Sequence, residues 1–358
     1  METSTTPSLF SAPTTNVTHF SSGDSQEESM TTKIVRIVGY SVLFIFGVFG
    51  NSMVILAVRK PHMKKVTNVL IANLGLADLL VAVFNIPSVV TYAHLWRWPF
   101  GEVLCKVLPF LQGLTLCASV GTLLGIALDR YWHIVHFKRR KITLKEAYKL
   151  IVLIWVSSII IPMPLLIFCK ILIVAQNGTE YILCEEVWPN LASRQAYTMI
   201  LFLVLYLFPL MAISILYFVI AQSLSRMPSI SSSLEESRHR AQQRVIRMLI
   251  VVVILFAFCW LPYHVTFIYI DYFSPIRTQA LVTSILFFQW LVFASSACNP
   301  VVYALLNQNY RREFVKMLAF RRQPSIRQGP PHQERDNVNL VGQSSKSTTN
   351  SYFFVTSV

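Results

Sequence analysis

One carboxylate, Asp78, lies in the middle of a long apolar run of the sequence. A charge at the centre of a membrane is unfavourable unless it faces the protein interior and finds partners there. Polar residues expected at similar depth on other apolar runs are Asn51, Ser119, Ser295, Ser296 and Asn299. A carboxylate among neutral oxygens and amides, with no lysine or arginine beside it, suits a small monovalent cation or a proton. A purely structural hydrogen-bond network is the alternative.

A second set of polar and aromatic residues follows helical spacing. Trp260, His264, Phe267 and Asp271 stand at positions i, i+4, i+7 and i+11, which places them on one face of a helix. This stripe would climb from the middle of the membrane to its outer surface. An acidic residue above an aromatic and imidazole lining indicates a site for the cationic group of a ligand.

Neutral and acidic residues extend this expected ligand pocket. Gln112 and Gln289 are expected at comparable depth on two other runs, so the pocket floor would bind by neutral hydrogen bonds. Glu185 and Glu186 in an outer loop, together with Asp271, would meet positive charge higher up. For the two loop glutamates, the alternative is an ordinary solvated loop.

Prolines in four of the apolar runs are candidate positions for helix bends. A proline removes an intrahelical hydrogen bond and bends the helix, which membrane proteins tolerate when neighbouring groups compensate. The sequences Cys259-Trp260-Leu261-Pro262 and Asn299-Pro300-Val301-Val302-Tyr303 place bulky or polar side chains beside the bend. We predict hinges there, against the alternative of bends that merely pack. The prolines are Pro162, Pro164, Pro209, Pro262 and Pro300.

Enzymes and transporters fit the sequence poorly. The chain has no metal triad, paired intramembrane acids, serine dyad or glycine-rich phosphate loop. A transporter would be expected to show paired repeats with broken helices in matching positions, and none is detected. We therefore predict a protein that is not an enzyme.

The elements that must position these residues are membrane-spanning helices. The chain has 358 residues, of which 54% are hydrophobic and only 13% are charged, and its mean hydropathy is +0.53. These values exclude a soluble domain. We predict an all-α bundle of seven membrane-spanning helices, in the apolar runs 34–58, 67–93, 104–136, 147–169, 195–224, 243–270 and 279–305.

Charge and cysteine placement orient the expected bundle. Cys105 and Asp129-Arg130-Tyr131 lie about 37 Å apart along one helix, so they belong to opposite sides of the membrane. The net charge of +14 gathers in the loops on the Arg130 side, which the positive-inside rule makes cytoplasmic, so nucleic acid is not an expected partner. The N-terminus is then outside, with no cleavable signal peptide expected.

Outer-surface chemistry agrees with this orientation. Cys105 and Cys184 are the cysteines left near the outer surface, and we predict that they form a disulfide, whereas Cys169 is expected to be a small apolar side chain near the end of a span. The sequons at Asn16 and Asn177 also fall on the expected outer face and are candidate glycosylation sites.

The predicted organisation has four parts. A disordered extracellular segment, 1–32, precedes the seven-helix domain, 33–308. A short amphipathic helix, 309–321, would lie on the inner leaflet of the lipid bilayer, followed by a disordered tail, 322–358. The final Thr356-Ser357-Val358 suits a PDZ-type groove, and nearby serines and threonines are candidate phosphorylation sites. A solvated tail without a partner is the alternative.

These residues together resemble the signature set of rhodopsin-like G-protein-coupled receptors over about 34–320. The resemblance implies that Asp129-Arg130-Tyr131 contacts a heterotrimeric G protein, that Trp260 senses the ligand, and that the Asp78 position holds sodium. It also implies a plasma-membrane location and arrestin binding after tail phosphorylation. Further residues of the implied activation switch are Pro209, Tyr217, Phe256, Pro262, Asn299, Pro300 and Tyr303.

Within that family, the segments around Trp98, Gln112 and Cys184 resemble receptors for neuropeptide FF, neuropeptide Y and orexin. The resemblance implies an amidated peptide, of Arg-Phe-amide or Arg-Tyr-amide type, whose arginine pairs with the acid at Asp271. Gln112 stands where amine receptors have an aspartate, which argues against a monoamine. A different ligand, such as another peptide or a lipid, or an orphan receptor, is the alternative.

The chain departs from the family pattern at three places. Phe137 stands where many relatives have proline, Val120 replaces the more usual isoleucine behind Pro209, and no acid lies near Gln242 to restrain Arg130. A loosely restrained inactive state, with some basal activity, is the hypothesis that follows.

Overall fold

The computed structural model describes residues 29–95, 97–136, 141–176, 179–226, 233–273 and 278–319, all within one compact unit that ends at Ala319. The sequons at Asn16 and Asn177, Phe137 and the terminal Thr356-Ser357-Val358 lie outside the described residues. The predictions made for these positions therefore remain predictions.

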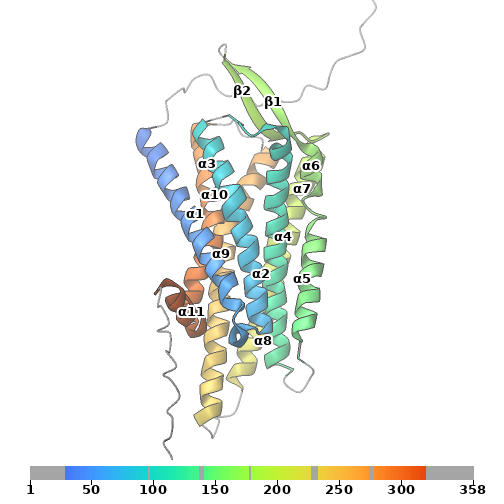
Figure 1. Ribbon diagram of the computed structural model, residues 1–358. Coiled ribbons are helices and arrows are strands. Elements are labelled where there is room, and N and C mark those ends of the chain that lie inside the picture. Colours follow the sequence, from blue (N-terminus) through green and yellow to red (C-terminus); the bar gives the residue numbers. More distant parts are fainter. Residues whose placement is uncertain are drawn as a thin grey trace, which may run out of the picture. The chain divides into compact units, whose positions relative to one another are not determined.

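Seven helical spans are long and apolar enough to cross a membrane, and they form a bundle (Figure 1). The predicted all-α, seven-helix architecture is confirmed, with bounds within a few residues of those expected from the apolar runs. A short helix follows the seventh span, also as predicted. The helices are α1 (Met30–Val58), α2 (Val66–Leu80), α3 (Ile86–Leu95), α4 (Gly101–Ile134), α5 (Leu144–Ser158), α6 (Met163–Phe168), α7 (Leu191–Phe202), α8 (Phe208–Ser225), α9 (Ser233–Phe273), α10 (Gln279–Leu306) and α11 (Gln308–Leu318).

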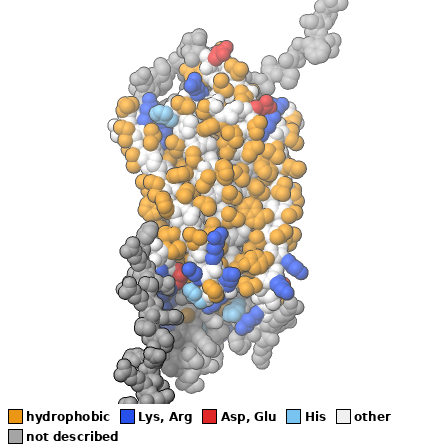
Figure 2. Space-filling view, in the orientation of Figure 1, with side chains coloured by type: hydrophobic (Ala, Val, Ile, Leu, Met, Phe, Trp, Pro, Cys, Tyr) orange, Lys and Arg blue, Asp and Glu red, His pale blue; other side chains and the backbone are white. Residues whose placement is uncertain are grey.

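The surface of the bundle is apolar where lipid would surround it. Large side chains such as Phe258 and Ile160 are about 70% exposed, whereas Tyr40, Met248 and Phe293 are fully buried between helices. Figure 2 shows hydrophobic side chains over the middle of one face and Lys and Arg gathered toward its ends. This distribution matches a bundle whose middle lies in hydrocarbon and whose ends meet water.

Proline affects the helices in two different ways. The fourth span breaks between α5 and α6, next to Pro162-Met163-Pro164. A π-helical turn at Val81–Asn85 divides α2 from α3, and another at Leu203–Leu207 divides α7 from α8. By contrast, α9 and α10 continue as helices through Pro262 and Pro300. The turn at Val81–Asn85 was not predicted, since a π turn has no compositional signature.

Two glycines allow helices to approach closely. A Cβ atom added to Gly50 of α1 would lie 2.8 Å from ring atoms of Pro300 in α10, and one added to Gly113 of α4 would lie 2.6 Å from the Cβ of Pro162. Any side chain at either position would force the helices apart, so these residues set the contact between backbones.

An antiparallel hairpin, β1 (Cys169–Gln176) and β2 (Thr179–Glu186), stands over one end of the bundle (Figure 1). The disulfide predicted between Cys105 and Cys184 is present, with the two Cα atoms 5.6 Å apart, and it ties β2 to the start of α4. The backbone N–H of Trp98 also donates to the carbonyl of Ile182 over 2.7 Å. We call this the hairpin end, and the opposite end of the bundle the Arg130 end.

The hairpin itself was not predicted. Cys169, expected to be a small apolar side chain near the end of a span, is buried but begins β1, where it pairs with Glu186. Strand-favouring residues such as Ile171, Ile173 and Val174 resume the apolar run after one lysine, Lys170, and a single charge does not distinguish the start of a strand from the end of a helix.

Candidate functional site

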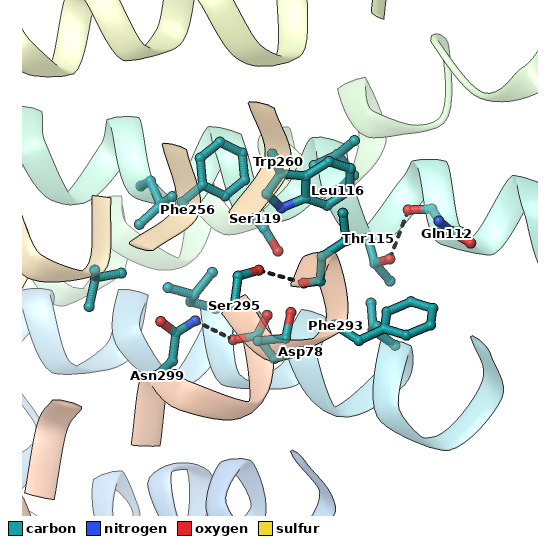
Figure 3. A pocket seen from close by; sticks show the side chains of 16 residues that line it. Asp78, Gln112, Thr115, Leu116, Ser119, Phe256, Trp260, Phe293, Ser295 and Asn299 are labelled. Atoms are coloured by element: carbon teal, nitrogen blue, oxygen red, sulfur yellow. Dashed lines mark hydrogen bonds between the residues drawn. The ribbon is translucent and has the colours of Figure 1, made fainter. Parts of the chain in front are cut away.

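Asp78 lines a small cavity of about 30 Å³ in the middle of the bundle (Figure 3). Asn299 of α10 donates a hydrogen bond from Nδ2 to Asp78 Oδ2 over 2.8 Å, and Ser296 also hydrogen-bonds to the carboxylate. Ser119 and Ser295 line the same cavity. Of the residues expected around Asp78, Asn51 lies outside it, because its amide donates to the carbonyls of Gly47 and Ser296.

This cavity has the size and donor chemistry for a small hard ion. A volume of about 30 Å³ accommodates one or two water-sized particles. The carboxylate and hydroxyl oxygens are hard ligands, and the described residues contain no cluster of three or more His, Cys, Asp or Glu that would hold a transition metal. The residues present therefore fit the sodium ion expected at Asp78.

Trp260 joins this cavity to the aromatic cluster above it. Its indole lines the cavity with Phe256, whose ring centroid lies 5.8 Å away. On the other side it packs against His264, also at 5.8 Å, which Tyr206 contacts at 5.1 Å. Trp260 is therefore placed between Asp78 and the residues expected to contact a ligand.

The residues expected at the pocket floor lie inside the bundle, but they do not all line one cavity. Gln112 lines the cavity with Asp78 and accepts a hydrogen bond from Asn85 Nδ2 over 3.3 Å. His264 and Gln289 are buried but do not line that cavity. The Nε2 of His264 has no hydrogen-bond partner among the described residues. A buried nitrogen in this condition is suited to a ligand hydrogen bond.

Asp271, expected at the outer end of the aromatic stripe, is already paired with other residues of the chain. It is only 3% exposed and forms an ion pair with Arg194 of α7, whose Nε lies 2.7 Å from Asp271 Oδ1. Thr198 donates to the other carboxylate oxygen, and Gln195 Nε2 donates to the Asp271 backbone carbonyl over 2.9 Å. The sequence reasoning missed these α7 partners. Their spacing of i, i+1 and i+4 on one helix face was the available signal.

The two loop glutamates lie in β2, above this ion pair. Glu186 accepts a hydrogen bond from Trp188 Nε1 over 2.8 Å. Glu186 is an exposed residue, yet desolvation of its carboxyl by the surrounding protein raises the pKa of that group, and the negative charges of Asp271 and Glu185 act in the same direction. Arg194 partly offsets the shift. Phe267 lies below and packs against Tyr263, with ring centroids 4.6 Å apart.

At the Arg130 end, the residues of Asp129-Arg130-Tyr131 contact one another and their near neighbours. Arg130 pairs with Asp129 over 2.6 Å, and Thr67 of α2 donates to the same Asp129 oxygen over 2.6 Å. Tyr131 packs edge-on against Trp132. Asp129 and Arg130 line an open cavity of about 460 Å³, whose other basic lining residues are Lys65, His133 and Lys141.

The remaining expected switch residues lie on the helices between these sites. Tyr217 of α8 and Tyr303 of α10 are buried, and the Tyr303 ring packs against Tyr310 of α11 at 5.6 Å. Pro209 follows the π turn that ends α7, and Pro262 and Pro300 stand next to Trp260 and Asn299 in their helices.

Comparison with known proteins decides the family. The family model described as "7 transmembrane receptor (rhodopsin family)" matches residues 50–303. The chain belongs to the rhodopsin family of seven-transmembrane receptors. Neuropeptide FF receptor 1 of Homo sapiens is 35% identical to this receptor over 340 residues, which cover 90% of the chain and 77% of the relative.

Other relatives of this receptor have similar identities. The QRFP-like peptide receptor of Branchiostoma floridae is 32% identical over 82% of the chain, and neuropeptide Y receptor type 2 of Homo sapiens is 35% identical over 81%. These matches cover 80% and 77% of the two relatives. The receptor is therefore a multi-pass membrane protein and not an enzyme, and its predicted resemblance to neuropeptide FF and neuropeptide Y receptors is confirmed.

Proposed function

We propose that this receptor binds a peptide with an amidated C-terminus and an arginine before its last residue, and passes the signal to a heterotrimeric G protein. The names of its relatives, which are receptors for neuropeptide FF, QRFP-like peptides and neuropeptide Y, support a peptide ligand. The proposed last residues are Arg-Phe-amide or Arg-Tyr-amide.

The observation that carries the proposal is the buried carboxylate of Asp271 at the hairpin end. A side chain that is 1% exposed retains its negative charge only with a cation close by. Glu186 adds a second acid near the same place. A guanidinium group, which is planar and always charged, is the cation best suited to pair with a carboxylate there.

Neutral polar groups deeper in the bundle suit the amidated end of such a peptide. Gln112, His264 and Gln289 carry hydrogen-bonding side chains and no fixed charge. The described residues that line or surround this buried region include no lysine or arginine, so a terminal carboxylate would place an unpaired negative charge there, whereas an amide would not. We therefore expect the receptor to prefer the amide over the free acid.

In this proposal the hairpin end faces outward and the receptor lies in the plasma membrane. The disulfide between Cys105 and Cys184 supports that orientation, because such bonds persist in oxidising compartments. The Arg130 end, where Arg59, Lys64 and Lys65 are exposed, would face the cytoplasm and the G protein. Arrestin and a PDZ-domain protein remain proposed partners of the tail.

The test is a second-messenger screen, calcium and cyclic AMP together, of cells that express the full chain at their surface. We expect a response to amidated peptides that end in Arg-Phe or Arg-Tyr, and none to the same peptides as free acids. A surface-expressed receptor that is silent to every amidated peptide would contradict the proposed ligand class. It would leave membership of the rhodopsin family unaffected.

A further inference from the structure

The first two turns of α7 contact the last turn of α9 at Asp271. Arg194, Gln195 and Thr198 of α7 all contact Asp271, through one ion pair and two hydrogen bonds. Arg194 and Thr198, at positions i and i+4, share one face of α7, so they approach the Asp271 carboxylate from the same side. Gln195, beside Arg194, reaches the Asp271 backbone carbonyl. We call this set of contacts the Arg194 clasp.

The two charged members of the clasp differ in their access to water. The side chain of Asp271 is 1% exposed, and that of Arg194 is 30% exposed. A carboxylate so deeply buried requires a cation, because it has little water to replace one. The guanidinium of Arg194, in contrast, retains solvent contact and has a long, rotatable side chain. Of the two partners, Arg194 is the one that can leave.

A second acid is available to Arg194 when it leaves. Glu186 of β2 interacts electrostatically with both Arg194 and Asp271. Its neighbour Trp188 donates a neutral hydrogen bond and adds no charge. Asp271 and Glu186 together therefore carry one more negative charge than Arg194 neutralises. One further guanidinium would neutralise the remaining negative charge of these three residues.

We infer that Arg194 is a specificity-determining residue: in the free receptor it occupies the position on Asp271 that the arginine of the ligand takes, and it turns to Glu186 when the ligand binds. This inference rests on the proposed function. A free cationic amine competes poorly with a tethered guanidinium, since Arg194 is always present at high local concentration. A peptide can displace it because its other contacts hold its arginine beside Asp271.

The first test requires no ligand. Full-length receptor and its Arg194→Gln, Asp271→Asn and doubly substituted forms are purified, and their melting temperatures are compared. We expect each single substitution to lower the melting temperature, and the double substitution to lower it no further than the worse single one. Lys106→Gln is the matched control, because it removes a cation from an exposed pair with Glu102 and should change little. Additive losses would overturn the clasp.

The second test measures, in cells, whether the peptide arginine replaces Arg194 on Asp271. Surface expression is matched between variants. An amidated peptide ending in Arg-Phe should activate Arg194→Gln at an about tenfold lower concentration than it activates the unsubstituted receptor, because its arginine no longer competes for Asp271. The same peptide with alanine in place of arginine should gain nothing. Unchanged or weaker potency on Arg194→Gln would overturn the exchange while leaving the ligand class intact.

Arg194→Lys keeps the second test interpretable if Arg194→Gln does not fold. A lysine keeps the positive charge but lacks the planar fork of arginine, so its potency should fall between those of the unsubstituted receptor and Arg194→Gln. If the unsubstituted receptor is silent to all amidated peptides, the ligand class and the exchange both fail. The melting temperatures then still decide whether Arg194 is the counter-ion of Asp271.

Discussion

Asp271 is the residue on which the proposed ligand contact depends, and its burial sets the size of the expected effect. Asp271→Ala should weaken binding of an arginine-bearing peptide by about 2–5 kcal/mol, because a buried charge pair is lost. A peptide whose arginine is replaced by alanine should lose little more on the substituted receptor, which competition binding would measure. Additive losses for the two changes would mean that the two groups do not meet.

Glu186 should make peptide binding sensitive to pH. Its pKa is raised mainly by desolvation, so acidification neutralises it earlier than an ordinary glutamate. The charged groups around it are Glu185, Arg194 and Asp271, and the titratable side chains of Tyr197, Tyr263 and Cys169 are also near. Loss of its negative charge weakens attraction for a cationic peptide, so affinity should fall as pH falls.

Binding of a radiolabelled peptide at neutral and mildly acidic pH would measure this dependence. Glu186→Gln should bind more weakly at neutral pH and show less change on acidification, because its side chain does not titrate. Glu180→Gln, in the same strand, is the matched control. An equal pH dependence in Glu186→Gln and the unsubstituted receptor would assign the effect to another group.

Asp78 should make agonist binding sensitive to sodium. An ion that binds one arrangement of the helices shifts the population toward that arrangement, and thereby changes ligand affinity. Replacing sodium chloride by choline chloride should raise agonist affinity by at least about fivefold in the unsubstituted receptor. Asp78→Asn should remove that difference. A salt effect that survives in Asp78→Asn would place the ion elsewhere.

At the scale of elements, the disulfide and the hairpin form one unit over the pocket. Cys105→Ser and Cys184→Ser should each abolish peptide binding at the cell surface, because β2 loses its covalent tie to α4. The doubly substituted receptor should be no worse than either. Cys169→Ala, which changes a buried cysteine without a disulfide in the same hairpin, should retain binding. Normal binding in Cys184→Ser would contradict a structural role for the bond.

The elements differ in how far their sequences predict them. Each span is a long apolar run of a length that only a membrane helix needs, so all seven were predictable. The hairpin was not, because Ile171, Ile173 and Val174 resume the apolar run of α6 after the single charge of Lys170. The ion pair between Arg194 and Asp271 joins residues of different helices. The spacing of Arg194 and Thr198 marks a polar face of α7, but it gives no information on which helix that face meets.

At the scale of the whole receptor, little ionic restraint holds Arg130 in place. Among the described residues its ion pair is with its own neighbour Asp129, and residues 239–273 of α9 contain no acid at the Arg130 end. We therefore expect a second-messenger signal without ligand, above that of mock-transfected cells. Gln242→Glu should reduce that signal by adding an acid to α9.

Gln243→Glu is the matched control for Gln242→Glu. It adds the same charge one residue further along α9, about 100° around the helix, and should leave the signal closer to that of the unsubstituted receptor. A ligand-free signal equal to that of mock-transfected cells would remove the hypothesis of basal activity altogether.

The contact between Gly50 and Pro300 has a directional consequence. Since α1 and α10 already touch through a glycine and a proline ring, α10 has no room to move toward α1 at that level. A bend at Pro300 must therefore carry α10 away from α1 or take α1 with it. In mechanical terms, α1 acts as a one-sided stop, so the hinge predicted at Pro300 is expected to open only in directions that lead away from α1.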